Sequence, residues 1–90
     1  MGQAIMNPED VRRFADELKR FNTELQSGMS SLQARFIALG ETWQDQEHLK
    51  FAEEFRTAMR SLKHFVEVSS QHTPFLLRKA QRIEDYLNQR

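Results

Sequence analysis

Two long series of apolar residues, spaced alternately three and four positions apart, occupy almost the whole of this 90-residue sequence. That spacing follows one face of an α-helix, and no strand pattern competes with it. The first series is Val11, Phe14, Leu18, Phe21, Leu25, Met29, Leu32, Phe36 and Leu39. The second is Ala52, Phe55, Met59, Leu62, Val66, Ser69, Thr73, Leu76, Ala80, Ile83 and Leu87. We therefore expect one all-α domain over residues 1–90, built from two long helices.

Residues that begin or end helices stand at both ends of these series. Asn7 can cap a first helix and Pro8 suits its first turn. Gly40 can end that helix, and Asp45 is the best cap for the second, with Thr42 as a rival. These signals predict a helix over about residues 8–40, a turn over about 40–45 and a helix over about 46–88.

Pro74 lies inside the second series. A proline in a helix interior removes the hydrogen bond to the carbonyl four residues back, here that of Ser70, at a cost of about 3 kcal/mol. Because the apolar spacing passes through Pro74 unbroken, a kinked continuous helix is favoured. In the alternative, the helix breaks there and Thr73 caps a separate last helix. The hydroxyls of Ser69, Ser70 and Thr73 lie within reach of the freed carbonyl.

Both apolar stripes are wider than the seam between two helices requires. Folding about residue 42 would place Leu18 near Val66 and Val11 near Thr73, so that the chain after about Leu76 overhangs the first helix by about 20 Å. We therefore expect a two-helix antiparallel hairpin that dimerises into a four-helix bundle, with each tail covering the other hairpin's turn. The residues expected to pack on the partner are Phe75, Leu76, Leu77, Ala80, Ile83, Tyr86 and Leu87.

Several kinds of function are disfavoured by composition and spacing. Lys plus Arg and Asp plus Glu both number 13, which argues against binding to nucleic acid or anionic membranes. The sequence has no cysteine, and His48, His64 and His72 are too far apart for the histidine pairs of zinc or di-iron sites. No catalytic constellation or phosphate-binding loop is apparent. We therefore expect no enzyme activity, no metal and no cofactor.

The turn carries a short motif that resembles a known family. Trp43-Gln44-Asp45, with Leu39 four residues before the tryptophan and Phe51 eight residues after it, resembles the WXG family of early-secreted-antigen-like helical hairpins. The family's motif glycine falls at position 45, where aspartate tolerates the turn and caps well. The family's export motif has a tyrosine followed four residues later by an acidic residue. Tyr86 occupies a suitable place, but position 90 is Arg90.

This resemblance implies a role in type VII secretion, as a substrate or partner that acts by protein–protein interaction. We expect Trp43 to close the open end of the bundle, whether or not it also takes part in docking. The candidate docking residues are Trp43, Asp45 and Phe51. The expected partner is a second copy or a related hairpin. A secretion ATPase or a toxin-like protein is a possible further partner. The alternative is a structural dimerisation adaptor or chaperone for a larger, toxin-like partner.

The expected location is the cytoplasm, with export by a route that does not use a signal peptide. Residues 1–6 do not join a basic region to an apolar core of at least seven residues, as a secretory signal does. No window approaches the length of a transmembrane span.

Overall fold

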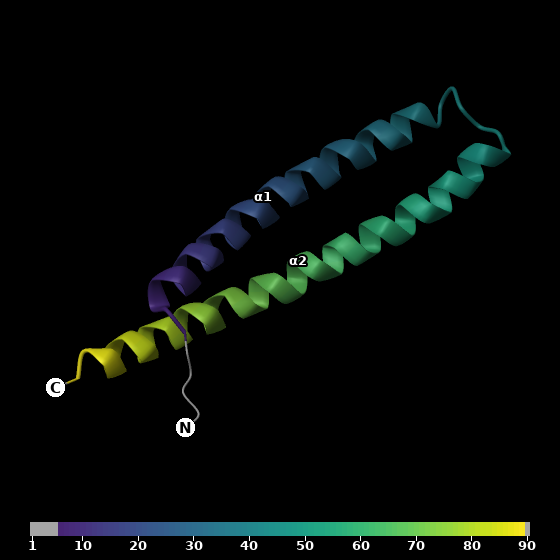
Figure 1. The fold of residues 1–90 in the computed structure, drawn as a ribbon. Helices are drawn as coiled ribbons and strands as arrows, with labels where there is room; N and C mark the ends of the chain where they lie inside the picture. The colour runs from purple at the N-terminus through teal and green to yellow at the C-terminus, as the bar shows by residue number, and fades with distance from the viewer. Residues whose placement is uncertain (1–5, 90) are drawn as a thin grey trace.

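The computed structural model describes residues 6–89 and confirms an antiparallel hairpin of two helices (Figure 1). Helix α1 spans Pro8–Leu39, and helix α2 spans Gln46–Leu87. Residues 1–5 and Arg90 lie outside the described residues, so the structure does not bear on the expectations about a signal sequence or the export motif.

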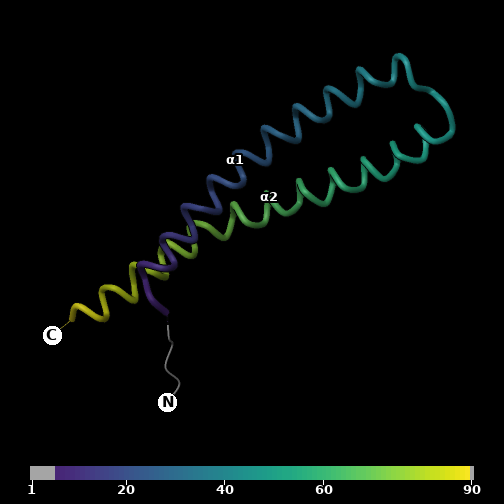
Figure 2. The backbone as a smooth tube through the Cα atoms, turned by 45° about the horizontal axis from the view of Figure 1, so that its top comes forward, coloured from purple at the N-terminus to yellow at the C-terminus, as the bar shows by residue number. Residues whose placement is uncertain are grey.

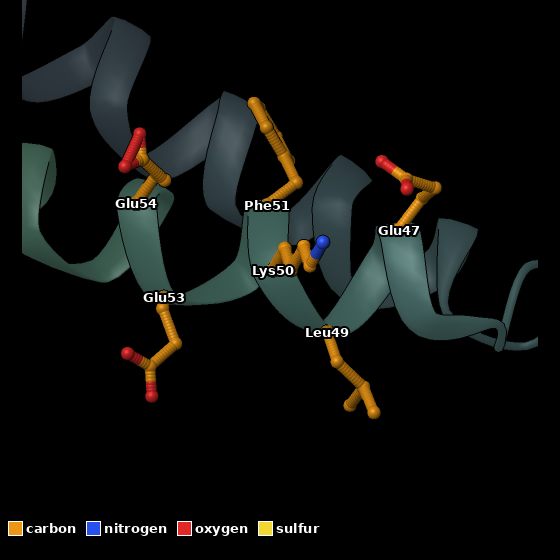
Figure 3. A pocket seen from close by; sticks show the side chains of 6 residues that line it. All are labelled: Glu47, Leu49, Lys50, Phe51, Glu53 and Glu54. Carbon is orange, nitrogen blue, oxygen red and sulfur yellow. The ribbon is translucent and has the colours of Figure 1, made fainter.

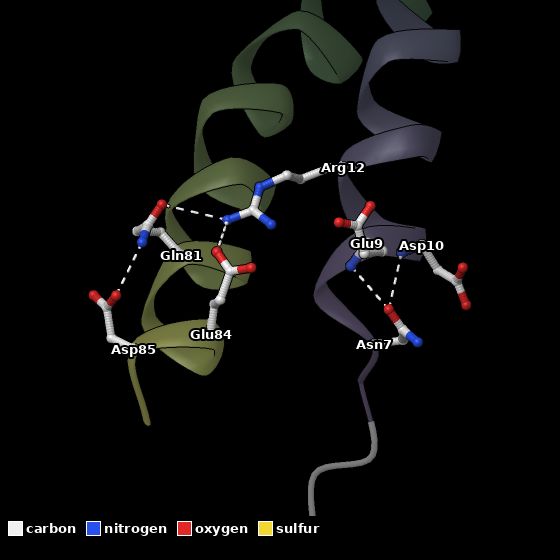
Figure 4. Close-up of polar contacts among 7 residues, drawn as sticks. All are labelled: Asn7, Glu9, Asp10, Arg12, Gln81, Glu84 and Asp85. Carbon is white, nitrogen blue, oxygen red and sulfur yellow. Dashed lines mark hydrogen bonds and ion pairs between the residues drawn. The ribbon is translucent and has the colours of Figure 1, made fainter. Parts of the chain in front are cut away.

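Both helices begin at side-chain caps. The Oδ1 atom of Asn7 accepts hydrogen bonds from the amides of Glu9 at 2.8 Å and Asp10 at 3.2 Å (Figure 4). The Oδ1 atom of Asp45 accepts the amide of His48 at 3.0 Å. These bonds satisfy amides that have no partner within the helix, which explains why α1 and α2 start where they do.

Helix α2 runs for 42 residues, and Pro74 lies inside it. Two hydroxyls near Pro74 bond to carbonyls one turn back: Thr73 donates to the Ser69 carbonyl at 3.0 Å, and Ser69 donates to the Phe65 carbonyl at 2.7 Å. Their protons therefore serve carbonyls other than that of Ser70, the one that loses its amide donor to the proline.

The seam between the helices is built mostly from small residues, several of them seven positions apart. The buried seam positions are Ala15 and Asn22 on α1 and Ala52, Val66, Ser69, Thr73 and Ala80 on α2. Ala15 and Ala80 are completely buried, and small side chains let helix backbones approach closely. Figures 1 and 2 both show the helices converging toward the start of α1, where these alanines lie.

The helices face each other in a different register from the one expected. Thr73 lines a surface hollow together with Asn22, whereas the fold about residue 42 placed it near Val11. Arg12 instead reaches Glu84, with Nη2 2.6 Å from Oε1 (Figure 4). Side chains on a helix tilt toward its N-terminus, which is away from the turn on α1 and toward the turn on α2. A residue of α1 therefore contacts a residue of α2 that lies further from the turn than simple folding about residue 42 suggests. The overhanging part of α2 is consequently shorter than predicted.

The hairpin is long and only one helix layer thick. Its principal extents are 69 × 24 × 15 Å, and its radius of gyration is 20.0 Å. A compact domain of this length would have a radius of gyration of roughly 12 Å. Most side chains are therefore at a surface.

Candidate interaction surfaces

The turn between the helices is held by hydrogen bonds to the end of α1. The amide of Trp43 donates to the Leu39 carbonyl at 3.0 Å, and the Gln44 side chain donates to the Gly40 carbonyl at 2.8 Å. Gly40 has φ −63° and ψ −14°, an ordinary helical conformation. Glycine suits this position because of close packing: a Cβ atom would lie 3.3 Å from the Ile37 carbonyl oxygen and 3.5 Å from Nε2 of His48.

Trp43 packs on a histidine that sequence reasoning did not single out. The rings of Trp43 and His48 meet edge to face, with centroids 5.0 Å apart. The His48 ring also stacks on Phe36, with centroids 5.2 Å apart and an interplanar angle of 9°. We call Phe36, Trp43, Asp45 and His48 the tip cluster. His48 lies in the first turn of α2, three residues after the Asp45 cap, and this position close to the turn is the signal that could have identified it.

Asp45 links this cluster electrostatically. The hydrogen bond from the His48 amide lowers the pKa of the Asp45 carboxyl, and the nearby Trp43 side chain lowers it further. Its φ of −101° and ψ of −172° are extended values that any residue adopts. The backbone at position 45 thus has no need of glycine, and the aspartate gains a cap and a contact with the tryptophan.

Phe51 lies at the edge of the tip rather than in a closed core. Figure 3 shows its ring pointing to the side on which α1 lies, whereas Leu49 and Glu53 point away. The ring is 5.7 Å from that of Phe36 and 6.0 Å from that of Phe55, centroid to centroid. Phe51 remains about half exposed, so it both packs within the hairpin and presents a surface.

A second surface runs along one side of the hairpin. Its helical spacing places a set of large apolar residues beside the seam, and contacts between Phe21 and Phe65 and between Phe36 and Phe51 join the two helices on this side. Each member is between 36% and 55% exposed. We call this set the aromatic face; it consists of Phe14, Phe21, Leu32, Phe51, Leu62 and Phe65.

The seven residues expected to pack on a partner do not form one group in the hairpin. Phe75, Tyr86 and Leu87 are exposed, the last two by 74% and 60%. Ala80, by contrast, is fully buried against the hairpin's own first helix because the register brings α1 this far along α2. Leu76, Leu77 and Ile83 are intermediate in exposure.

Asn22 is the second residue that the sequence analysis missed. It is 95% buried in the seam, with 5% of its surface exposed. Its Nδ2 atom donates to Oγ of Ser69 at 2.7 Å, while its Oδ1 atom has no hydrogen-bond partner among the described residues. The signal for it is a seven-residue series, Ala15, Asn22, Met29 and Phe36. Its last two members belong to the apolar stripe, and its first two directly follow stripe residues in the sequence.

Within residues 6–89, no three or more His, Asp or Glu side chains gather as metal ligands. Neither described helix is long and apolar enough to cross a membrane.

Comparison with known proteins gives a consistent result for family and fold. The model of the WXG100 family, described as proteins of 100 residues with WXG, matches residues 3–86. The crystal structure of the secreted protein EsxB from Bacillus anthracis str. Sterne superposes with a TM-score of 0.72 at 23% identity, covering 98% of this chain and all of that one. A mutant of EsxB gives a TM-score of 0.69 at 21% identity, covering 100% and 99%. No curated protein matches the chain.

Proposed function

Because the chain belongs to the WXG100 family, helical hairpins associated with type VII secretion, we propose that it is a non-enzymatic substrate or partner in that pathway. It acts by protein–protein interaction, through the aromatic face and the tip cluster. It is made in the cytoplasm and leaves the cell without a signal peptide, either alone or with its partner. The description of EsxB as a secreted protein supports this route.

The observation that carries the proposal is the uncovered aromatic face. The hairpin exposes 7411 Å² of surface, whereas a compact monomer of 10.7 kDa would expose roughly 5,500 Å². The extra exposed surface of the hairpin is larger than the roughly 800 Å² that each partner contributes to an interface of standard size. A monomer rarely keeps so continuous an apolar strip in water.

The proposed occupant is a second copy of the chain, or a related hairpin, packed antiparallel to give a four-helix bundle. The face runs along both helices, and the hairpin is one layer thick, so a second layer completes the bundle. A two-fold interface is self-complementary, which suits a surface without a strong excess of either charge. In this arrangement the exposed Tyr86 and Leu87 of one copy reach toward the tip of the other.

The tip cluster is the proposed docking element of the assembled protein. Trp43 closes the end of the hairpin while keeping part of its ring exposed, and aromatic side chains of this kind often dominate binding energy at protein interfaces. Phe51, at the start of the aromatic face, contacts Phe36 of the tip cluster, with ring centroids 5.7 Å apart. The two surfaces are therefore continuous, and a partner that contacts one can contact the other.

Export from the native host tests the proposal. A tagged chain is followed in cells and culture fluid of the parent strain and of a strain lacking the type VII secretion ATPase, and tagged protein is purified from both fractions. The expected result is that the chain, or a larger protein that co-purifies with it, reaches the fluid only when the ATPase is present. Equal amounts in the fluid of both strains would contradict the proposal. A chain that stays in the cell, bound to a toxin-like protein whose export does not need the ATPase, would favour the adaptor or chaperone role.

A further inference from the structure

We propose that Gly28 is a socket that receives the ring of Phe21 from a second copy, and that this contact fixes how the two hairpins are offset along each other. The inference rests on the second copy proposed above as the occupant of the aromatic face. It goes further, because it names the residues that meet across the interface.

The hairpin by itself has no need of a glycine at position 28. Gly28 is exposed in the interior of α1, and a Cβ atom added to it would meet no other part of the described chain within 4 Å. Glycine in a helix interior is less favourable than alanine, because its backbone loses more freedom on folding. The missing side chain therefore leaves room for something outside the hairpin.

Gly28 belongs to the same side of α1 as the rings of the aromatic face. The residues of α1 that face α2 recur every seven positions, as the buried Ala15 and Asn22 show, and Met29 continues this series. The residue before each of them points about 100° round the helix, off one side of the hairpin. That row consists of Phe14, Phe21, Gly28 and Arg35. Its first two members are exposed rings, so Gly28 is a notch in the surface that they form.

A row of the same kind runs along α2. It precedes the buried Ala52, Val66 and Thr73 by one position and consists of Phe51, Ala58, Phe65 and His72. The rings of Phe21 and Phe65 contact each other across the two helices, with centroids 6.3 Å apart. Gly28 and Ala58 each lie seven residues nearer the turn. The face thus has two rings at one level and two small residues at the next.

An antiparallel second copy brings these two levels together. When two hairpins pack face to face and antiparallel, α1 lies on α1 and α2 lies on α2, and a two-fold axis runs across both. An axis midway between the levels sets Phe21 of each copy on Gly28 of the other. The same axis sets Phe65 of each copy on Ala58 of the other. Large side chains then fill the space above small ones, which gives close packing without voids.

The neighbouring registers fit less well. Moving one copy by seven residues sets Phe21 against Phe21, which crowds two rings, or Gly28 against Gly28, which leaves a void. In the proposed register Arg35 of one copy instead meets the Phe14 ring of the other, with the carboxylate of Glu17 one turn along. Arg35 is exposed and has no ion-pair partner among residues 6–89. Packing and charge therefore favour the same register.

The first experiment fills the socket. Gly28→Leu adds a side chain at an open position of the hairpin, so helix content should stay at the parent level. Because this side chain takes the place of the partner copy's ring, the dimer dissociation constant should rise at least tenfold in sedimentation velocity. Ser27→Leu is the matched control: Ser27 is also exposed, but it lies two positions before Met29 and points away from α2. Equal dissociation constants for the two variants would overturn the socket.

The second experiment reads the register by disulfide formation, because the chain has no cysteine of its own. Chains carrying Phe21→Cys and Gly28→Cys, one of them tagged, are mixed, oxidised and separated by non-reducing electrophoresis. In the proposed register the two substituted positions face each other, whereas each lies about 10 Å along the helix from the same position in the other copy. That offset is too large for a disulfide. The mixed dimer should therefore cross-link at least tenfold faster than either variant alone.

The remaining outcomes separate this inference from the proposed function. Cross-linking of either variant alone at the rate of the mixture would overturn the register, and so would no cross-linking in a mixture that light scattering shows to be dimeric. Both results leave the second copy in place. A parent protein that is monomeric at the same concentration would overturn the second copy itself, and the socket with it.

Discussion

Phe21 and Phe65 meet edge to face across the two helices, with ring centroids 6.3 Å apart and planes at 84°. Despite this contact, 51% of Phe21 and 45% of Phe65 remain exposed. The pair joins α1 to α2 on the side next to the seam, but nothing in the hairpin covers it. It therefore marks the middle of the surface that we assign to the second copy.

Replacing Phe65 by aspartate tests this assignment. A charge in the middle of the aromatic face would be buried without a partner on association, so Phe65→Asp should raise the dissociation constant of the dimer at least tenfold, about 1.4 kcal/mol. Leu49→Asp is the matched control, because Leu49 is also exposed on α2 but points away from the aromatic face (Figure 3). Sedimentation velocity over a concentration series measures both. Equal weakening by the two substitutions would remove the aromatic face from the interface.

The buried pair of Asn22 and Ser69 predicts non-additive effects on stability. Ser69→Ala removes the only partner of Asn22 in the seam and should lower the free energy of unfolding by about 1–3 kcal/mol. The double variant Asn22→Leu with Ser69→Ala removes both polar groups and should lie within about 1 kcal/mol of the parent. Urea denaturation of the parent, Ser69→Ala, Asn22→Leu and the double variant at a fixed protein concentration gives the four values that the comparison needs. Simple addition of two losses would show that the hydrogen bond does not couple these residues.

The Asp45 cap predicts a specific loss of stability in acid. Its pKa is lowered in the folded state from the usual value of 3.8, so its contribution is complete above that value and is lost as the pH falls through the lower folded value. Asp45→Ala should therefore reduce the melting temperature at neutral pH and change it less in strong acid. Asp45→Asn keeps a capping oxygen but does not titrate, so it should preserve more stability at neutral pH than Asp45→Ala and weaken the dependence on acid.

Thermal melts between about pH 5 and pH 2 measure this dependence. Asp16→Asn, at an exposed aspartate on α1, is the control for the general effect of removing a carboxylate. An acid profile for Asp45→Asn that matches those of the parent and the control would contradict the assigned role.

Pro74 predicts a stabilising substitution. Alanine at this position restores an amide that can bond to the Ser70 carbonyl and relieves the proline's conflict with the preceding turn, so Pro74→Ala should raise the free energy of unfolding by about 2–3 kcal/mol. Gln71→Ala, at an exposed position one turn earlier, should change it by no more than about 0.5 kcal/mol. Denaturant titration compares the two. A loss of stability in Pro74→Ala would mean that the proline fills a packing role at the hollow it lines with Asn22.

The sequence was a good guide to the elements and a poorer one to the faces they present. Capping chemistry at Asn7 and Asp45 is local, and the structure shows both caps. Which residues are buried between the helices is not decided locally. Phe14 and Phe21 share a wide stripe with Ala15 and Asn22, and periodicity alone does not show which of these neighbours faces the other helix. The larger residues look like the core, but small residues form the seam because they allow the helices to approach.

The tip was predictable only in part, for a similar reason. The motif identified Trp43 and the cap identified Asp45, but the contact of Trp43 with His48 depends on the path of the turn and on the stack with Phe36 from the other helix. Register also limited the prediction for the tail. The direction in which side chains tilt shifts contacts in the seam further along α2, and this moved Ala80 from the expected partner surface into the hairpin's own seam.

The central claim is that the aromatic face is covered by a second helical hairpin, and the molar mass in solution tests it most directly. Size-exclusion chromatography with light scattering is applied to the full-length protein at micromolar concentration. The account predicts a stable particle of twice the 10.7 kDa chain mass, which Phe65→Asp dissociates and Leu49→Asp does not. A parent protein that stays at 10.7 kDa on its own, and gains no mass when mixed with the hairpin proteins of its secretion locus, would contradict it.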